Sequence, residues 1–335
     1  MRHALLVLGL AATIGAATAA GQTAPVAGEP PHVIGLVHFI HATDTLETTT
    51  AFYRDVFGLD APLRPFTNPA VATLNNVPGI VLRASRPIFP DKAGFEITEF
   101  TNVARKGGQA APSDPGAIAL MIPVRDLDVV VAALKKRGAP IVTASGEPQT
   151  ITTARGPRRA VVVRDPDGFL VWAMQVPAAE ATETGLMQPG VTMVVTVNDL
   201  DRAAAFYTGL GFAFTGSRAF TRDTAMARLF GLPASSEHRT VSAPIPGTVA
   251  SRVSFIEWKG MPRTPFHLNV YDPGAGGFVL RVTRIDDMVA KMKADGLRVI
   301  SAGGGPVPFG PTSRNVFVVD PNGMNLELTE STPAR

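Results

Sequence analysis

The candidate metal ligands in this chain of 335 residues are its histidines and carboxylates, because it contains no cysteine. Disulfides, thiolate metal sites, iron–sulfur clusters and cysteine nucleophiles are thereby excluded. Candidates lie inside apolar runs typical of strands: His38 and His41 in VHFIHA, and Glu96 and Glu99 in FEITEF. Because side chains alternate between the two faces of a strand, the two members of each pair face opposite sides. Imidazole and carboxylate groups act as general acids and bases and as ligands of divalent metal ions.

The composition is that of a globular protein. Hydrophobic residues make up 45% and charged residues 18%, which excludes an intrinsically disordered chain. The net charge is +3, from 31 basic and 28 acidic residues, and the surplus forms no Lys/Arg run. At about 150 residues per domain the length predicts two domains. We therefore expect no nucleic-acid partner.

Residues 1–20 have the pattern of a secretory signal peptide. Met1-Arg2-His3 is a short basic start, Ala4 to Ala17 is an apolar run, and the small residues around Ala19 suit signal peptidase. The run is shorter than the ~20 residues of a membrane span, and a retained anchor helix is the alternative. Residues 21–32, rich in Pro, Gly and Ala, form a flexible lead. We expect a periplasmic or secreted protein without membrane contact after cleavage of the signal.

The remaining chain contains an internal repeat. Three motifs recur in the same order after 154 to 158 residues. They are Phe52-Tyr53 with Phe206-Tyr207, Asp165-Pro166-Asp167-Gly168 with Asp320-Pro321-Asn322-Gly323, and Asp114-Pro115-Gly116-Ala117 with Asp272-Pro273-Gly274-Ala275. Residues 33–180 and 188–331 are therefore expected to be two halves of the same architecture joined by a linker. A finer repeat divides each half into two modules.

Each module has the pattern of a strand, a short helix and further strands. Apolar residues recur with helical period in the helices, as at Leu127, Val130, Val131 and Leu134. The expected helix N-caps are Asp44, Asp126 and Asp199, and the expected C-terminal glycines are Gly58, Gly138, Gly209 and Gly296. The edges of one such small sheet need a partner. We predict an α+β fold of four βαβββ modules paired into two half-barrel domains.

Four segments resemble a known superfamily. VHFIHATDTLETTTAFYRDVFGL and MVVTVNDLDRAAAFYTGLGF resemble the opening unit of vicinal oxygen chelate proteins, the glyoxalase/bleomycin-resistance/extradiol-dioxygenase group. DPDGFLVWAMQ and DPNGMNLELTE resemble the closing strand of its modules. The resemblance covers nearly all of the chain after the lead and implies the half-barrel fold. It implies function only broadly, since lyases, isomerases, dioxygenases and metal-free binding proteins share that fold.

The superfamily places metal ligands at two positions per module, on the first and last strands. By this resemblance His38 and Glu96 occupy both positions of the first module, and Glu327 occupies the last-strand position of the fourth. The other five positions hold Ala119, Trp172, Thr192, Ser254 and Gly277. The resemblance thus implies a divalent metal ion, either Zn, Mn, Fe or Ni, bound by His38, Glu96 and Glu327.

Each candidate ligand also has a structural interpretation. In that interpretation His38 is a half-buried strand histidine without a ligand role. Glu327 is a residue inherited in a degenerate closing strand and no longer functional. His41, which has the opposite parity to His38, is expected to point away from the cleft. Glu99 has a counterpart at Glu257, and both are expected to be surface carboxylates at the ends of strands.

The pairing of the modules decides whether the three candidate ligands meet. If the first module pairs with the second, one cleft holds His38 and Glu96, and the other holds Glu327 alone. If the first pairs with the fourth, as in duplicated glyoxalases, one cleft holds all three. The sequence leaves both pairings open. A four-module chain can close both barrels within itself, so a monomer suffices.

Three functions follow from these alternatives. The first is a divalent-metal-dependent lyase, isomerase or oxygenase acting on a small oxygenated substrate. The second is metal-free binding or sequestration of a small molecule, which the absence of ligands from the second and third modules favours. The third is a structural role with both sites decayed. Glyoxalase I activity itself is disfavoured for an exported protein, and extradiol cleavage lacks the second histidine of its ligand set.

Overall fold

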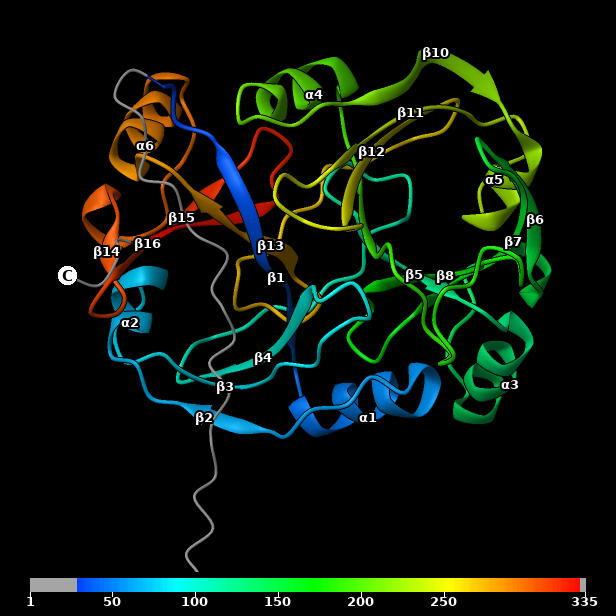
Figure 1. Cartoon of the computed structure of the whole chain (residues 1–335), viewed down its shortest axis with the longest axis horizontal. Coiled ribbons are helices and arrows are strands. Elements are labelled where there is room, and N and C mark those ends of the chain that lie inside the picture. Colours follow the sequence, from blue (N-terminus) through cyan, green and yellow to red (C-terminus); the bar gives the residue numbers. More distant parts are fainter. Residues whose placement is uncertain (1–28, 332–335) are drawn as a thin grey trace, which may run out of the picture. The chain divides into compact units, whose positions relative to one another are not determined.

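Four copies of one strand–helix–strand unit follow one another along the chain, seen in Figure 1 as colours running from blue to red. The structure is a computed structural model and describes residues 29–331, so the predicted signal peptide and most of the flexible lead lie outside the described residues.

Module 1 comprises β1 (Val33–Thr43), α1 (Leu46–Phe57), β2 (Arg64–Phe66), α2 (Ala70–Asn75), β3 (Val81–Ser85) and β4 (Gly94–Thr101). Module 2 comprises β5 (Ile118–Val124), α3 (Leu127–Arg137), a 3-10 turn (Ala144–Gly146), β6 (Gln149–Thr153), β7 (Gly156–Arg164) and β8 (Leu170–Gln175). Module 3 comprises β9 (Thr192–Thr196), α4 (Leu200–Thr208), β10 (Thr215–Arg222), α5 (Thr224–Leu229), β11 (Glu237–Pro244) and β12 (Arg252–Lys259). Module 4 comprises β13 (Gly276–Val282), α6 (Ile285–Ala294), a 3-10 turn (Ala302–Gly304), β14 (Val307–Pro308), β15 (Ser313–Val319) and β16 (Asn325–Ser331).

The modules pair first with fourth and second with third. One eight-stranded sheet has the order β14-β15-β16-β13-β1-β4-β3-β2, and the other has the order β10-β11-β12-β9-β5-β8-β7-β6. Antiparallel pairing of β1 with β13 joins the modules of the first sheet, and antiparallel pairing of β5 with β9 joins those of the second. The predicted α+β fold of two half-barrels is therefore confirmed. The open question of pairing is settled in favour of the arrangement that places all three candidate ligands in one sheet.

The helices begin close to the predicted positions. The carboxylates of Asp126 and Asp199 accept hydrogen bonds from backbone N–H groups in the first turns of α3 and α4. The expected cap at Asp44 is wrong, because Thr45 occupies the N-cap of α1 and makes no side-chain cap. The backbone N–H of Asp44 donates instead to Oδ1 of Asp167, at 2.7 Å. The hydrogen bond from Asp44 to the distant Asp167 thus takes the place of the local side-chain cap expected for α1.

Glu99 and Glu257 stabilise helix starts and are not surface groups. The backbone N–H of Leu46 donates to Oε2 of Glu99, and that of Leu200 donates to Oε2 of Glu257, both at 2.8 Å. Glu257 is only 8% exposed. A carboxylate near the positive end of a helix dipole is favourable there. The expectation of surface carboxylates was wrong because their partners come from another element.

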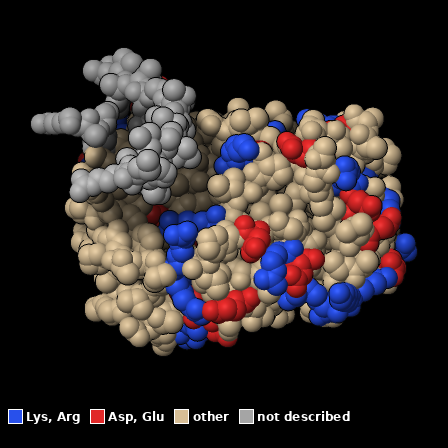
Figure 2. All heavy atoms as spheres, turned by 60° about the horizontal axis from the view of Figure 1, so that its bottom comes forward, with Lys and Arg blue, Asp and Glu red and all other residues tan. Residues whose placement is uncertain are grey.

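The helices lie in pairs beside the sheets, α1 with α3 and α4 with α6 (Figure 1). The apolar residues that recur along each helix are buried in the main hydrophobic core, as predicted. Two buried tyrosines join the two modules of each sequence half at equivalent places: the hydroxyl of Tyr53 donates to Asp165, and that of Tyr207 donates to Asp320. No helix within residues 29–331 is long and apolar enough to cross a membrane. On the face shown in Figure 2, basic and acidic side chains are interspersed.

Candidate functional site

One cleft of the first sheet contains all three candidate ligands. It is a cavity of about 260 Å³, here called the first cleft. His38 of β1, Glu96 of β4 and Glu327 of β16 line it, together with apolar side chains of both modules. Four phenylalanines contribute to these apolar walls, namely Phe66, Phe100, Phe309 and Phe317. The first cleft is thus an apolar pocket with a few polar groups, which is the usual composition of a small-molecule site.

The strand register explains why these three residues meet. His38 lies opposite Val279 of β13, and Val279 lies beside Glu327 on the next strand. On the other side of β1, Glu96 lies beside Ile40, two residues beyond His38. Residues two apart on a strand share a face. Pairing of the first and fourth modules therefore places the three side chains on one face, although about 230 residues of sequence separate Glu96 from Glu327.

Glu96 lies in a cluster of polar groups. Nε of Arg86 donates to its Oε2 at 2.6 Å, Nε2 of His38 lies 3.3 Å from the same oxygen, and the hydroxyl of Thr98 donates to Oε1 at 3.2 Å. Burial alone would raise the pKa of Glu96, but the facing charges of His38 and Arg86 bring it below its ordinary value. Burial lowers the pKa of His38 by more than the charge of Glu96 raises it. At neutral pH the pair is thus a charged carboxylate beside a neutral imidazole.

Glu327 lies in a different environment on the same cleft. It is 8% exposed, and its Oε1 accepts a hydrogen bond from the amide of Asn315 at 2.6 Å. The hydroxyl of Thr329 donates to the other end of that amide, at 2.9 Å, and fixes its orientation. Burial raises the pKa of Glu327 to about 8, and the negative charge of Glu96 adds to this effect. In the absence of a cation, Glu327 is therefore protonated at neutral pH.

The fourth ligand position of the first cleft cannot hold a side chain. That position is Gly277, where an added Cβ would lie 2.2 Å from the carbonyl oxygen of Asn325. Such a contact is far inside van der Waals distance, so glycine is required there. A metal site in this cleft would have three protein donors and positions open to substrate, as catalytic metal sites do.

The donor set of the first cleft fits a divalent cation. The neutral imidazole of His38 offers a lone pair, and two carboxylates supply the negative charge. A cation between Glu96 and Glu327 would remove the repulsion that contributes to the raised pKa of Glu327. Arg86 would have to release Oε2 of Glu96, and its side chain is 52% exposed, so it can move without disturbing the core.

In the region of the second sheet equivalent to the first cleft, here called the second cleft, no ligand position holds an imidazole or a carboxylate. Its ligand positions hold Ala119, Trp172, Thr192 and Ser254. Trp172 packs edge-on against Phe230 with ring centroids 5.4 Å apart, and Phe230 packs in the same way against Trp258 at 5.6 Å. Within the part of the chain that the structure describes, only the first cleft combines a cavity with an imidazole and two carboxylates.

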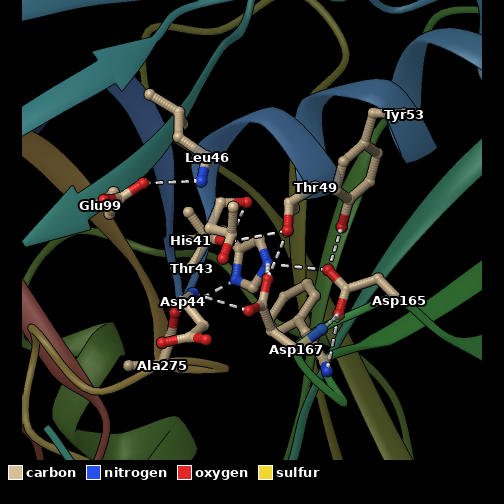
Figure 3. A network of polar contacts seen from close by, with 12 residues as sticks. His41, Thr43, Asp44, Leu46, Thr49, Tyr53, Glu99, Asp165, Asp167 and Ala275 are labelled. Atoms are coloured by element: carbon tan, nitrogen blue, oxygen red, sulfur yellow. Dashed lines mark hydrogen bonds and ion pairs between the residues drawn. The ribbon is translucent and has the colours of Figure 1, made fainter.

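A second polar cluster, shown in Figure 3, lies between modules 1 and 2. His41 points away from the first cleft, as its parity predicts, and is fully buried. Its Nε2 lies 2.7 Å from Oδ2 of Asp165 and 3.4 Å from Oδ2 of Asp167. Among residues 29–331 these three form the one group of His, Asp and Glu side chains whose ligand atoms all lie within 4.8 Å of one another. This cluster was not predicted from the sequence.

The surroundings of this cluster favour a proton over a metal ion. Thr49 and Tyr53 donate their hydroxyls to Oδ2 of Asp167 and Asp165, and backbone N–H groups donate to both Oδ1 atoms. Burial lowers the pKa of His41, but the charge and hydrogen bond of Asp165, followed by those of Asp167, raise it to about 10. The imidazolium of His41 therefore supplies the positive charge. In the other half the motif spacing places Val195 at the position of His41, Ala203 at that of Thr49 and Asn322 at that of Asp167.

Two arginines of the first cleft were not identified from the sequence. Arg86 pairs with Glu96, and Arg281 lines the cleft from β13. Arg281 could have been found, because it shares the strand parity of Gly277 and Val279. Arg86 follows the end of β3, and nothing in its local sequence indicates a contact with Glu96.

Comparison with known proteins gives a family and a fold. A family model described as Glyoxalase/Bleomycin resistance protein/Dioxygenase superfamily matches residues 35–173 and again 191–328. No curated protein matches the chain. The structure of glyoxalase I from Zea mays aligns over 90% of this chain and 92% of its own, with a TM-score of 0.57 and 15% identity. A proposed dioxygenase from Bacillus subtilis aligns over 90% and 87%, with a TM-score of 0.55 and 14% identity. At these identities the two structures are evidence for the fold alone.

Proposed function

Because the chain belongs to the glyoxalase/bleomycin resistance protein/dioxygenase superfamily, we propose that its first cleft binds a divalent metal ion and acts on a small oxygenated substrate. The ligands are His38, Glu96 and Glu327, and the reaction is that of a lyase, isomerase or oxygenase. The observation that carries the proposal is that a neutral imidazole and two carboxylates line one apolar cavity, next to a position that only glycine can occupy. When bound, the ion would polarise neighbouring substrate oxygens as a Lewis acid.

The residues of the chain contribute binding, orientation and exclusion of water. The apolar walls desolvate a substrate of suitable size, which strengthens every polar interaction inside the cleft. Asn315 and Thr329 hold Oε1 of Glu327 in place, and Arg86 with Thr98 does the same for Glu96. Such supporting hydrogen bonds orient the groups that would contact metal or substrate.

Metal content of the purified protein tests this proposal. Protein prepared without chelator should contain about one ion per chain by mass spectrometry. His38→Ala and Glu327→Gln should each lose it, because two remaining donors make a weak site. Thr192→Ala, at the position in the second cleft equivalent to His38, is the matched control and should keep the ion. Wild-type protein that binds no divalent ion on titration would refute the metal-dependent function.

A metal-free binding function is the second candidate, and one observation favours it. The guanidinium of Arg86 already occupies Oε2 of Glu96, so the cleft has a positive group of its own beside that carboxylate. This function predicts that small organic ligands raise the melting temperature of chelator-treated protein. Turnover that requires added metal and disappears in His38→Ala would exclude it.

We also propose that the protein is exported, as the pattern of residues 1–20 favours. Expression of the full chain in a Gram-negative host tests this proposal. The mature protein should be recovered from the periplasm with an N-terminus near residue 20. Recovery of the uncleaved chain from the cytoplasm would refute export without affecting the proposal for the first cleft.

A further inference from the structure

The first cleft contains one cationic side chain that no group among residues 29–331 neutralises. Arg281 lies on β13, two residues beyond Val279, and both side chains line the cavity. Within residues 29–331 Arg281 makes no ion pair or hydrogen bond through its side chain, whereas Arg86 on the same cleft is paired with Glu96. Glu327, the other carboxylate of the cleft, is bonded to Asn315 and forms no ion pair with Arg281.

Hydroxyl side chains line the same cavity as this arginine. Thr329 of β16 is the register partner of Arg281, and Ser331, two residues further on, lies opposite Ser313 of β15. All of these residues line the first cleft. The hydroxyl of Thr329 is used by Asn315, but those of Ser313 and Ser331 make no hydrogen bond as donors within the described residues. Three adjacent strands thus present one guanidinium and two unused hydroxyl donors to the cavity.

We infer that Arg281, with Ser313 and Ser331, is the subsite for a carboxylate of the substrate, so that the first cleft acts on a small organic anion. A guanidinium and hydroxyl donors match the oxygens of a carboxylate, and a single unpaired cation favours a monoanionic group over a phosphate dianion. Residues 279 and 281 are about 7 Å apart along the strand. The carboxylate is therefore held about 7 Å along the cleft from the level of His38 and Glu327. The substrate is an anion whose reacting oxygens lie several bonds from its carboxylate.

This inference deepens the proposed function, and its test works without metal. The probes are glutarate, which has carboxylates at both ends of a five-carbon chain, and glutaramide, its uncharged counterpart. Titrations of chelator-treated wild-type protein, followed calorimetrically, should show binding of glutarate and none of glutaramide. Arg281→Ala should weaken glutarate binding by about 10- to 100-fold, as expected for the loss of hydrogen bonds to a charged group. Arg281→Lys should recover part of it.

The controls separate this inference from the metal proposal. Arg228→Ala removes an exposed arginine of α5, outside the first cleft, and should bind glutarate like the wild type. Arg281→Ala should retain the metal content of the wild type. The inference is wrong if the wild type does not bind glutarate, if Arg281→Ala binds it equally, or if 3-phosphonopropionate binds more tightly than glutarate. Absence of metal from every variant would refute the metal proposal and leave the subsite standing.

Discussion

At the scale of single residues, three ionisable groups in buried positions have different charge states, and their neighbours explain why. Glu96 is charged because the guanidinium of Arg86 pairs with it, whereas Glu327 is neutral because burial raises its pKa. His41 is charged because two carboxylates enclose it. The first cleft therefore contains a protonated carboxyl group, Glu327, and an ionised one, Glu96. The cluster between modules 1 and 2 contains an ion pair.

Glu327 should make the stability of the metal-free protein fall between pH 4.5 and about 8. Its pKa is 4.5 when unfolded and about 8 when folded, so the folded state holds the extra proton in this interval. The stabilisation is complete below pH 4.5 and is lost as pH rises, by at most about 1.4 kcal/mol per pH unit. Glu327→Gln removes this dependence and should be more stable than wild type at pH 9. Urea denaturation at pH 5, 7 and 9 measures this, and parallel profiles for both proteins would contradict it.

His41 should be among the most sensitive positions of the fold. His41→Ala leaves two buried carboxylates without their cation and should cost about 3–5 kcal/mol. Val195→Ala, at the apolar counterpart in the other half, is the control and should cost about 1–3 kcal/mol as a core truncation. Because the pKa of His41 is 6.5 unfolded and about 10 folded, its contribution is full below pH 6.5 and lost towards pH 10. Denaturant midpoints across this range should decline in the wild type and less in His41→Ala. Equal costs for the two substitutions would show that the imidazolium is not the stabilising charge.

At the scale of elements, the strands of the first sheet determine which positions can carry ligands. β13 passes so close to β16 that residue 277 must be glycine, whereas β1 has room for His38. The helices, by contrast, are positioned by carboxylates from strands, as with Glu99 on α1 and Glu257 on α4.

Gly277→Ala should destabilise the protein by about 1–3 kcal/mol, the usual cost of overpacking. The added methyl group would meet the carbonyl oxygen of Asn325, which β-sheet pairing prevents from moving. Gly107→Ala is the matched control, because nothing lies within 4 Å of its added Cβ and its φ is not positive. Thermal unfolding of the two variants beside the wild type measures the difference. An unchanged melting temperature for Gly277→Ala would show that a fourth ligand could be accommodated.

Local patterns in the sequence predicted the elements, but not the contacts between them. Helix period, capping residues and DP-containing turns are short-range features, so α3 and α4 begin where Asp126 and Asp199 predict. The cap at Asp44 and the surface positions of Glu99 and Glu257 were wrong because the deciding partner lies 53 to 123 residues away. Arg86 lies only 10 residues from Glu96, but it follows the end of β3, where no strand or helix pattern indicates the contact.

At the scale of the whole molecule, each sheet is built from both halves of the sequence. Residues 33–180 contain modules 1 and 2, which belong to different sheets, and the same holds for modules 3 and 4. The ion pair of His41 and the bonds from Tyr53 and Tyr207 then link the two sheets. The sequence repeat indicated the halves correctly but could not indicate the pairing, because either pairing buries the same apolar faces.

Neither half should therefore fold alone as a monomer. Expressed separately, residues 33–180 expose unpaired edges on the central strands β1 and β5. Residues 188–331 expose unpaired edges on the central strands β9 and β13. Mixed or co-expressed, the two fragments should form a one-to-one complex with the circular dichroism spectrum of the intact chain. Size-exclusion chromatography with circular dichroism measures both outcomes. A stable, cooperatively unfolding monomer of residues 33–180 would contradict the cross-paired architecture.

We propose the first cleft as the metal-dependent site and not the other clusters within residues 29–331. Anomalous diffraction from crystals soaked in a zinc salt tests it most directly, because it locates the ion. We expect one peak among His38, Glu96 and Glu327, and none at the cluster of His41, Asp165 and Asp167 or in the second cleft. A peak at the His41 cluster, or no peak in the first cleft, would contradict it.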